Sequence, residues 1–246
     1  MLRAFLIFVL VFPYTAVAAV VGLTWAALSG SVGLLFRLGH AGVRLALFLA
    51  GTKIALEGAH HLGDARNIVI MSNHESHLDA PVLFEGLGLD LRAVVKKEIF
   101  GWPFLGPVLR RAGFVAVDRR DRLQSARALS LAAERLRSGL CFLVFPEGTR
   151  SLTGELGPFK KGGFVAALEA GSRIVPVAVA GGRALMPRGG ARVQAGTVRV
   201  RVLDPVEAGS YSYDQRERLA GEVHRRIAAA LEDLRRDSGG GEPTAA

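Results

Sequence analysis

One segment of the chain combines a histidine and an aspartate at a spacing suited to acid–base chemistry, namely Asn73-His74-Glu75-Ser76-His77-Leu78-Asp79. It follows a short apolar run, residues 67–71, whose β-branched side chains predict a strand. If a helix begins near Asp79, the loop between them can fold the Asp79 carboxylate back onto the His74 imidazole. A carboxylate on Nδ1–H fixes the tautomer and leaves Nε2 free to accept a proton. The spacing therefore predicts His74 as a general base and Asp79 as the group that orients it.

No side chain stands out as a nucleophile for this base. Cys141 lies inside an apolar stretch, and the Gly-x-Ser-x-Gly motif is absent from the sequence. A substrate hydroxyl is then the simplest nucleophile, which predicts direct group transfer without a covalent enzyme intermediate. Because Cys141 is the single cysteine, it cannot form a disulfide within the chain.

The same segment permits a metal-binding alternative. His74, His77 and Asp79 have a spacing compatible with zinc, and Glu75 would then serve as the base of a metal-dependent hydrolase. Against this, the His-Glu-x-x-His motif is absent, and the remaining histidines show no ligand spacing. We therefore expect no metal, and we keep the hydrolase as an alternative.

Two further polar clusters follow predicted strands. Residues 118–120 (Asp-Arg-Arg) follow the strand candidate 114–117, and residues 147–150 (Glu-Gly-Thr-Arg) follow the candidate 142–145. Taken singly, each cluster is explained by a solvated turn, and Asp79 by a helix start. In open α/β sheets, however, ligands bind beyond the carboxyl ends of the strands. Three such clusters together indicate one shared site.

The rest of the sequence after residue 50 alternates strand and helix patterns, which predicts an α/β sheet covered by helices. Valine and arginine alternate over residues 197–203, as in an edge strand or a half-exposed strand. The glycine-rich end predicts a disordered tail, so we expect a catalytic domain over residues 51–236 and a tail over 237–246. Further strands are expected near 91–95 and 174–179, and helices near 79–87, 121–138, 162–170 and 214–236.

The N-terminus is a long apolar segment, with 33 uncharged residues between Arg3 and Arg37. As one straight helix they would extend about 50 Å, whereas the hydrocarbon core of a bilayer is about 30 Å thick. Pro13 and several glycines offer places to break the helix, which suggests a tilted span or a broken hairpin. We therefore expect residues 1–50 to form a hydrophobic membrane-anchoring helical segment.

A signal peptide and a buried core helix are the two alternatives to a membrane anchor here. A signal peptide would be cleaved near residues 16–18 (Ala-Val-Ala), but the chain stays apolar well beyond them. A buried core helix would be unusually long. Basic residues follow the apolar run more often than they precede it, which places the chain after residue 37 in the cytoplasm.

The net charge of +9, from 31 basic and 22 acidic residues, predicts an anionic partner. A nucleic acid, a phospholipid surface or a phosphorylated substrate would each satisfy it. Most of the basic residues are arginines, whose guanidinium groups bind phosphate in a bidentate manner. An arginine-rich codon bias would give the same excess.

These motifs together resemble the glycerolipid acyltransferase family, typified by 1-acylglycerol-3-phosphate acyltransferase. Asn73-His74 and Asp79 are followed some seventy residues later by Phe-Pro-Glu-Gly-Thr-Arg-Ser at 145–151. Two further blocks occur in the same order, one over residues 97–119 and the other over 174–177. The resemblance covers roughly residues 70–180.

The resemblance implies a central mixed, mostly parallel β-sheet, and transfer of an acyl group from acyl-CoA or acyl-ACP to lysophosphatidic acid. His74 and Asp79 would be catalytic. Alternatively, an enzyme of the same family would use another lysolipid as the acceptor, such as a lyso-ornithine lipid. The implied partners are a lysophospholipid and the surface of the inner membrane, with no nucleic acid, no metal and no cofactor beyond the acyl-CoA or acyl-ACP co-substrate. The implied substrate-binding residues are Asn73, Lys97, Arg119, Glu147, Gly148, Thr149 and Arg150.

Overall fold

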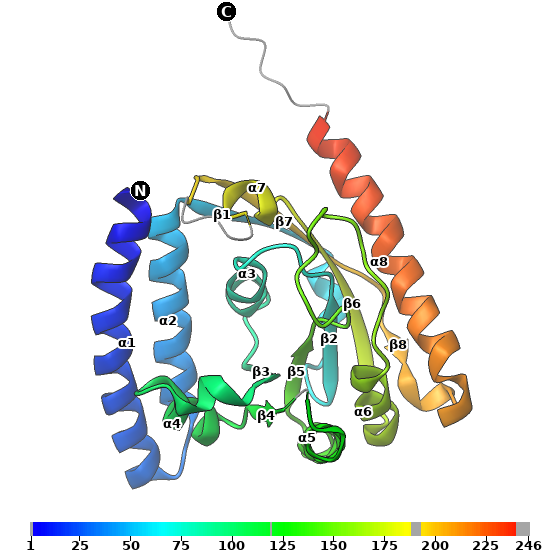
Figure 1. The fold of residues 1–246 in the computed structure, drawn as a ribbon, viewed down its shortest axis with the longest axis horizontal. Helices are drawn as coiled ribbons and strands as arrows, with labels where there is room; N and C mark the ends of the chain where they lie inside the picture. Colours follow the sequence, from blue (N-terminus) through cyan, green and yellow to red (C-terminus); the bar gives the residue numbers. More distant parts are fainter. Residues whose placement is uncertain (1, 119, 188–192, 240–246) are drawn as a thin grey trace, which may run out of the picture.

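The computed structural model of the chain describes residues 2–118, 120–187 and 193–239. Two apolar helices come first, α1 (Leu2–Ser29) and α2 (Gly33–Ala50), and an α/β unit follows (Figure 1). Its strands are β1 (Thr52–Glu57), β2 (Ile68–Ser72), β3 (Leu91–Lys96), β4 (Val115–Val117), β5 (Cys141–Val144), β6 (Arg173–Ala180), β7 (Gly196–Val202) and β8 (Val206–Glu207). Its helices are α3 (Asp79–Gly86), α4 (Leu105–Ala112), α5 (Arg122–Arg137), α6 (Gly162–Ala170), α7 (Gly182–Leu185) and α8 (Arg216–Gly239).

The strands form one sheet in the order β1-β7-β6-β2-β5-β3-β4, and β8 also pairs with β6. All neighbouring strands are parallel except that β6 pairs antiparallel with β7 and with β8. The expected mixed, mostly parallel sheet is therefore confirmed. The edge position considered for residues 197–203 is wrong, because β1 covers β7. The half-exposed alternative holds, since buried valines alternate with partly exposed residues along β7.

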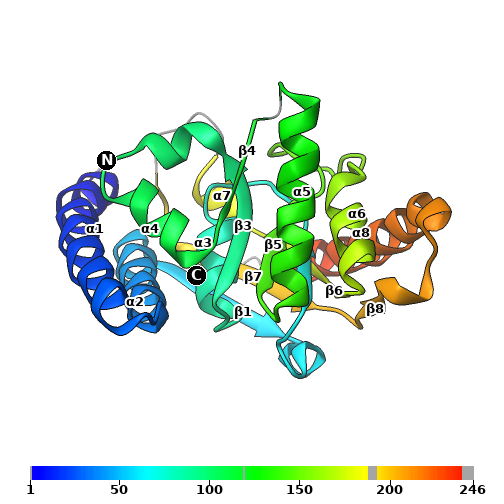
Figure 2. The same ribbon diagram turned by 90° about the horizontal axis from the view of Figure 1, so that it is seen from below.

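Helices cover both faces of the sheet (Figures 1 and 2). On one face α5, α6 and α8 pack against Val69 and Met71 of β2. On the other, α2 and α3 pack against Ile68 and Ile70 of the same strand. Every residue of β2 is buried, as expected for a central parallel strand. The site at its end therefore rests on a rigid element.

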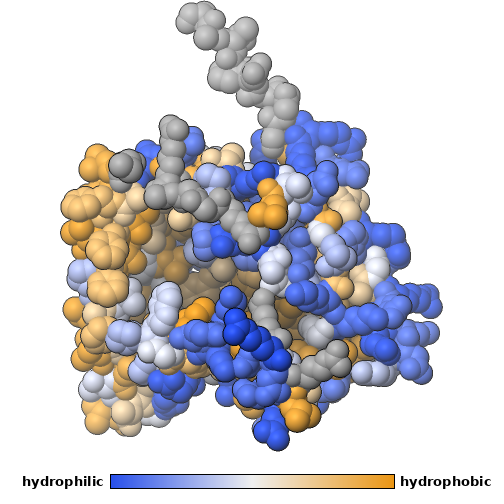
Figure 3. All heavy atoms as spheres, in the orientation of Figure 1, coloured by the Kyte–Doolittle hydropathy of each residue, from blue (hydrophilic) through white to orange (hydrophobic). Residues whose placement is uncertain are grey.

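The N-terminal helices form a hairpin, one of the two arrangements predicted. The chain turns between Ser29 and Gly33, whereas Pro13 lies inside α1 without ending it. Both helices are long and apolar enough to cross a membrane. The outer side of α1 is an apolar surface (Figure 3), while α2 contributes Leu47 to the core that it shares with α3. Residues 1–50 thus pack directly on the α/β unit, and their separation as an anchoring domain stays a prediction.

The strands β1 and β8 and the short helix α7 were not predicted. Helix α8 continues to Gly239, three residues past its predicted end. Residues 240–246 of the predicted tail lie outside the described residues.

Candidate active site

His74 and Asp79 meet as their spacing predicts. Strand β2 ends at Ser72 and α3 begins at Asp79, so the loop between them turns back on itself. The Asp79 Oδ2 atom lies 2.8 Å from His74 Nδ1 and also accepts the backbone N–H groups of Glu75 (2.7 Å) and Ser76 (2.8 Å). The Asp79 side chain is fully buried. Because an ionised carboxylate only accepts hydrogen bonds, Nδ1 of His74 carries the proton.

A second contact fixes the plane of the His74 ring. The ring of Phe145 stacks on it, with 4.0 Å between centroids and 15° between planes. The His74 side chain is 20% exposed, and within the described part of the chain nothing hydrogen-bonds its Nε2 atom. The imidazole is therefore held at one nitrogen and at one face, while the other nitrogen is available to take a proton.

The backbone of His74 is held by the segment that follows β5. Its N–H donates to Glu147 Oε1 at 2.8 Å, and its carbonyl accepts the N–H of Ser151 at 2.7 Å. The second oxygen of Glu147, Oε2, accepts the N–H of Gly157 at 2.9 Å. The buried Glu147 carboxylate therefore joins two loops through these hydrogen bonds, and it positions His74.

Asn73 also points into the protein rather than toward a substrate. Its Oδ1 accepts the N–H of Val179 and its Nδ2 donates to the Val179 carbonyl, both at 2.8 Å. The side chain thus continues the pairing of β2 with β6 for one more residue. Substrate contacts of Asn73 and Glu147 stay predictions, and both residues also have a positioning role.

Gly148, Thr149 and Arg150 form the turn beside His74. Gly148 has a φ of +74°, which favours glycine, and its N–H donates to the Phe145 carbonyl at 2.9 Å. A Cβ atom at Gly148 would lie 2.8 Å from Lys160 Nζ, so this ammonium group reaches over the turn. Thr149 is exposed, whereas Arg150 is half-buried.

A cationic group also lies at the ends of β3 and β4. Lys97 Nζ is 2.5 Å from Asp118 Oδ2, and this hydrogen bond raises the pKa of Lys97 and lowers that of Asp118. Arg119 lies outside the described residues. The pKa of His77 is lowered, first by the partial burial of its ring and next by the Arg150 charge, although much of the side chain stays exposed. Positive charge therefore follows the ends of β3 and β5, which lie at the same edge of the sheet as the end of β2.

Glu75 is a buried carboxyl that the predicted acyl-transfer chemistry does not use. It is 5% exposed, and its Oε1 atom lies 3.4 Å from the backbone nitrogen of Arg183. Burial raises its pKa, and the neighbouring Asp79 charge raises it further. Gly182 lies against the same carboxylate cluster, since a Cβ there would lie 2.9 Å from Asp79 Oδ1.

The metal alternative finds no matching cluster in the described ranges, where no group of three or more His, Cys, Asp or Glu side chains is arranged so that it could hold a metal ion. His74 is engaged with Asp79, and His77 is exposed.

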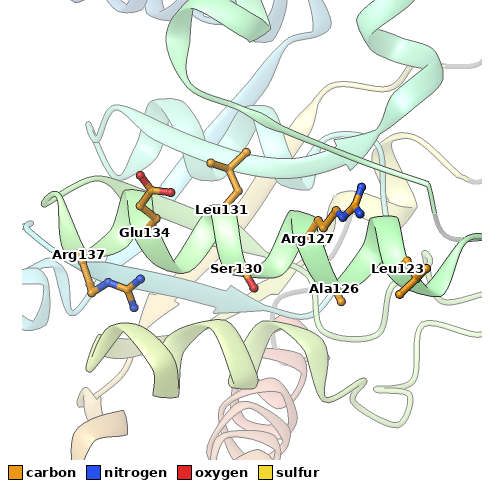
Figure 4. A pocket seen from close by; sticks show the side chains of 7 residues that line it. All are labelled: Leu123, Ala126, Arg127, Ser130, Leu131, Glu134 and Arg137. Carbon is orange, nitrogen blue, oxygen red and sulfur yellow. The ribbon is translucent and has the colours of Figure 1, made fainter.

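The described part of the surface has several hollows. Figure 3 shows one between the apolar hairpin and the hydrophilic part of the molecule. Figure 4 shows a groove along α5 that contains none of the predicted site residues. That groove is lined by Leu123, Ala126, Arg127, Ser130, Leu131, Glu134 and Arg137.

Comparison with known proteins identifies the family. The family model described as Acyltransferase matches residues 53–180. The chain is 33% identical over 182 residues to the chloroplastic 1-acyl-sn-glycerol-3-phosphate acyltransferase LPAT1 of Arabidopsis thaliana, covering 73% of this chain and 49% of that protein. It is 30% identical over 195 residues to the human 1-acyl-sn-glycerol-3-phosphate acyltransferase alpha, covering 79% and 69%.

A solved structure agrees in fold. The crystal structure of PlsC, the 1-acyl-sn-glycerophosphate acyltransferase of Thermotoga maritima, matches with a TM-score of 0.83 at 24% identity, over 95% of each chain. The chain spans about half the length of the plant relative and about two thirds of the human one. It belongs to the acyltransferase family.

Proposed function

We propose that this acyltransferase moves a fatty acyl group from acyl-CoA or acyl-ACP to the free hydroxyl of lysophosphatidic acid, giving phosphatidic acid for phospholipid biosynthesis. The observation that carries the proposal is the His74–Asp79 pair, whose free Nε2 faces no protein partner among the described residues. The relatives named for this reaction at about 30% identity support the acceptor.

The chemistry follows from the geometry of the pair. His74 Nε2 takes the proton of the acceptor hydroxyl as its oxygen attacks the thioester carbonyl. The tetrahedral intermediate collapses, the C–S bond breaks, and the imidazolium returns its proton to the leaving thiolate. Asp79, at 2.8 Å, stabilises the imidazolium in between. No covalent acyl-enzyme is required.

The acceptor phosphate would be held by cations around His74. Arg150 on the turn and Lys97 at the end of β3 carry the charge, and Arg119 joins them by its place in the sequence. Exposed Thr149 adds a hydroxyl. The N–H of Gly148 is already used by Phe145, so stabilisation of the oxyanion falls to neighbouring amides of the turn.

The hairpin accounts for how such a site meets its acceptor. Helices α1 and α2 would hold the enzyme at the inner membrane, with the catalytic part on the cytoplasmic side where the donor thioester is made. A reporter fused after Ala246 should therefore be active in the cytoplasm. Activity of the reporter only outside the cytoplasm would contradict this orientation.

The test is an acyl-transfer assay of the purified full chain with both donors and a panel of lysolipid acceptors. His74→Ala should lower kcat by about 10²- to 10⁴-fold while the protein stays folded, since the base is lost. The exposed His60→Ala is the matched control and should behave as wild type. Near-normal rates in His74→Ala would sink the mechanism.

The panel also separates the alternatives. Preference for a lyso-ornithine lipid over lysophosphatidic acid would replace the acceptor while keeping the chemistry. Stoichiometric zinc, with activity lost to a chelator, would favour the hydrolase.

A further inference from the structure

The segment between η2 (Lys97–Gly101) and α4 exposes two aromatic rings. Trp102 is 58% exposed and Phe104 is 43% exposed, and their neighbours Gly101 and Pro103 are exposed as well. Large aromatic side chains are usually buried in a soluble protein, and two of them exposed side by side often mark a surface that binds a partner. The predicted acyl-transfer chemistry uses neither of them.

The segment is rigid although it is exposed. The Trp102 carbonyl accepts the N–H of Gly106 at 2.9 Å, and Arg110 Nη1 donates to the Phe100 carbonyl at 2.7 Å. Gly106 is packed so closely that a Cβ there would lie 2.1 Å from the Phe100 carbonyl oxygen. The rings are therefore presented by a fixed scaffold.

Phe104 has a strained backbone, with φ +62° and ψ −52°. A bulky residue at positive φ is costly, and such strain is retained mainly where it serves a function. A glycine would adopt this conformation without strain, yet the chain places an exposed phenyl ring there.

The segment lies beside the apolar hairpin. Figures 1 and 2 both place α4 next to α1. Arg111 fastens the two helices, because its Nη2 donates to the carbonyls of Ala26 (3.0 Å) and Gly30 (3.1 Å) at the end of α1. Helix α4, which follows the aromatic pair directly, is thus fastened beside the C-terminal end of α1. Helix α1 exposes apolar side chains along its length, at Phe5, Phe8, Phe12, Trp25 and Leu28.

Charge on the same segment suits an anionic surface. Arg110 is exposed, and so is Lys97, whose ammonium group pairs with Asp118. Aromatic rings with neighbouring basic groups are typical of the headgroup layer of a membrane, where tryptophan concentrates and cations meet anionic lipid. A lipid surface fits this combination better than a protein partner does, since it continues the apolar surface of α1.

We propose that Trp102 and Phe104 insert into the headgroup layer of the leaflet that receives α1, forming a second membrane contact. This inference rests on the proposed membrane role of the hairpin. Because η2 begins at Lys97, the contact would fix a predicted phosphate-binding cation at headgroup depth. The acceptor phosphate would then reach the site without leaving its leaflet.

Tryptophan fluorescence tests the contact directly, because the chain has two tryptophans, Trp25 and Trp102. In the full-length Trp25→Phe protein, Trp102 is the single reporter. Added to vesicles of phosphatidylcholine and phosphatidylglycerol, it should show a blue-shifted emission. Lipids brominated near the headgroup should quench it more strongly than lipids brominated near the chain ends. An emission unchanged by vesicles would overturn the proposal.

The reciprocal protein, Trp102→Phe, keeps Trp25 and reports on α1. If Trp25 is quenched and Trp102 is not, the second contact is wrong and the membrane role of the hairpin stands. If neither is quenched, the membrane role itself fails. The two failures are therefore distinguishable, and a Trp102 that responds only to an added protein would also overturn the lipid assignment.

A kinetic measurement adds an independent readout. The double variant Trp102→Ser/Phe104→Gly should raise KM about tenfold for acceptor presented in anionic vesicles, and leave kcat and the rate on short-chain soluble acceptor unchanged. Leu123→Ser, at a 73% exposed leucine on α5, is the matched control for loss of surface apolarity. An equal rise in KM for this control would overturn the assignment.

Discussion

Gly182 gives the sharpest test of the base and its orienter, because it touches Asp79 from outside every motif. It opens α7, and its φ is not in the positive range that only glycine tolerates. An alanine there is acceptable to the backbone. Its Cβ, however, would lie 2.9 Å from Asp79 Oδ1 and 3.0 Å from Ser76 Cβ.

The size of the effect follows from these distances. Ordinary contacts begin at 3.4 Å, so the carboxylate or α7 has to move by about 0.5 Å. A shift of this size in Asp79 stretches its 2.8 Å hydrogen bond to His74 beyond good geometry. A hydrogen bond to a charged group contributes about 1.5–3 kcal/mol, and each 1.4 kcal/mol is tenfold in rate. We therefore expect Gly182→Ala to lower kcat by about 10- to 100-fold.

The assay is steady-state acyl transfer, with Tm measured alongside. KM should change little, because the proposed acceptor contacts are elsewhere, and Tm should fall by a few degrees through overpacking of about 1–3 kcal/mol. Gly209→Ala is the matched control, since a Cβ there meets nothing within 4 Å. A normal kcat in a Gly182→Ala protein whose Tm has fallen would refute the link between Asp79 alignment and rate.

Three further substitutions test the surroundings of the pair. Glu147→Gln should lower the free energy of unfolding by about 1–3 kcal/mol in urea titration, because the NH₂ group that replaces one carboxylate oxygen cannot accept a backbone N–H. Unchanged stability would contradict the role of Glu147 in holding the His74 and Gly157 backbones. Asn73→Asp should cost a similar amount, since an oxygen then faces the Val179 carbonyl, and an unaltered Tm would count against that pairing. Burial raises the pKa of Glu75, so the folded protein favours its protonated form and loses stability as pH rises above the ordinary range of a glutamate. Glu75→Gln has no carboxyl to ionise and does not lose stability in this way, so its Tm should exceed that of wild type at pH 8 and converge with it near pH 4. A constant difference in Tm across this range would refute the raised pKa of Glu75.

The pairing of His74 with Asp79 was predictable because the two residues are close in the sequence. His74 and Asp79 are five residues apart, and one strand end and one helix start suffice to bring them together. The helix over 121–138 and the central strands were predictable for the same reason, since their periodicity is complete within each segment. Strand β1 was not predictable, because polar and apolar residues alternate only weakly along its sequence. Its position depends on pairing with β7, more than a hundred residues later.

The orientation of Glu147 was not predictable either. The motif over 145–151 names the residue, but its partners are the backbone N–H groups of His74 and Gly157. Every non-proline residue carries such a group, so no sequence pattern marks the pair. Phe145 was likewise invisible as a neighbour of His74, since its stacking depends on the pairing of β2 with β5.

The segment 145–151 accordingly holds His74 in place, whatever contact it also makes with a substrate. Phe145 covers one face of the imidazole, Glu147 accepts the His74 N–H, and the Ser151 N–H binds the His74 carbonyl. These three contacts hold both the ring and the backbone of a residue that follows a different strand, β2. Of the polar side chains in the segment, Thr149 is exposed, and Arg150 and Ser151 are half-buried. The register of β2 against β5 therefore decides whether these contacts form, because it alone brings the two segments together although they are far apart in the sequence.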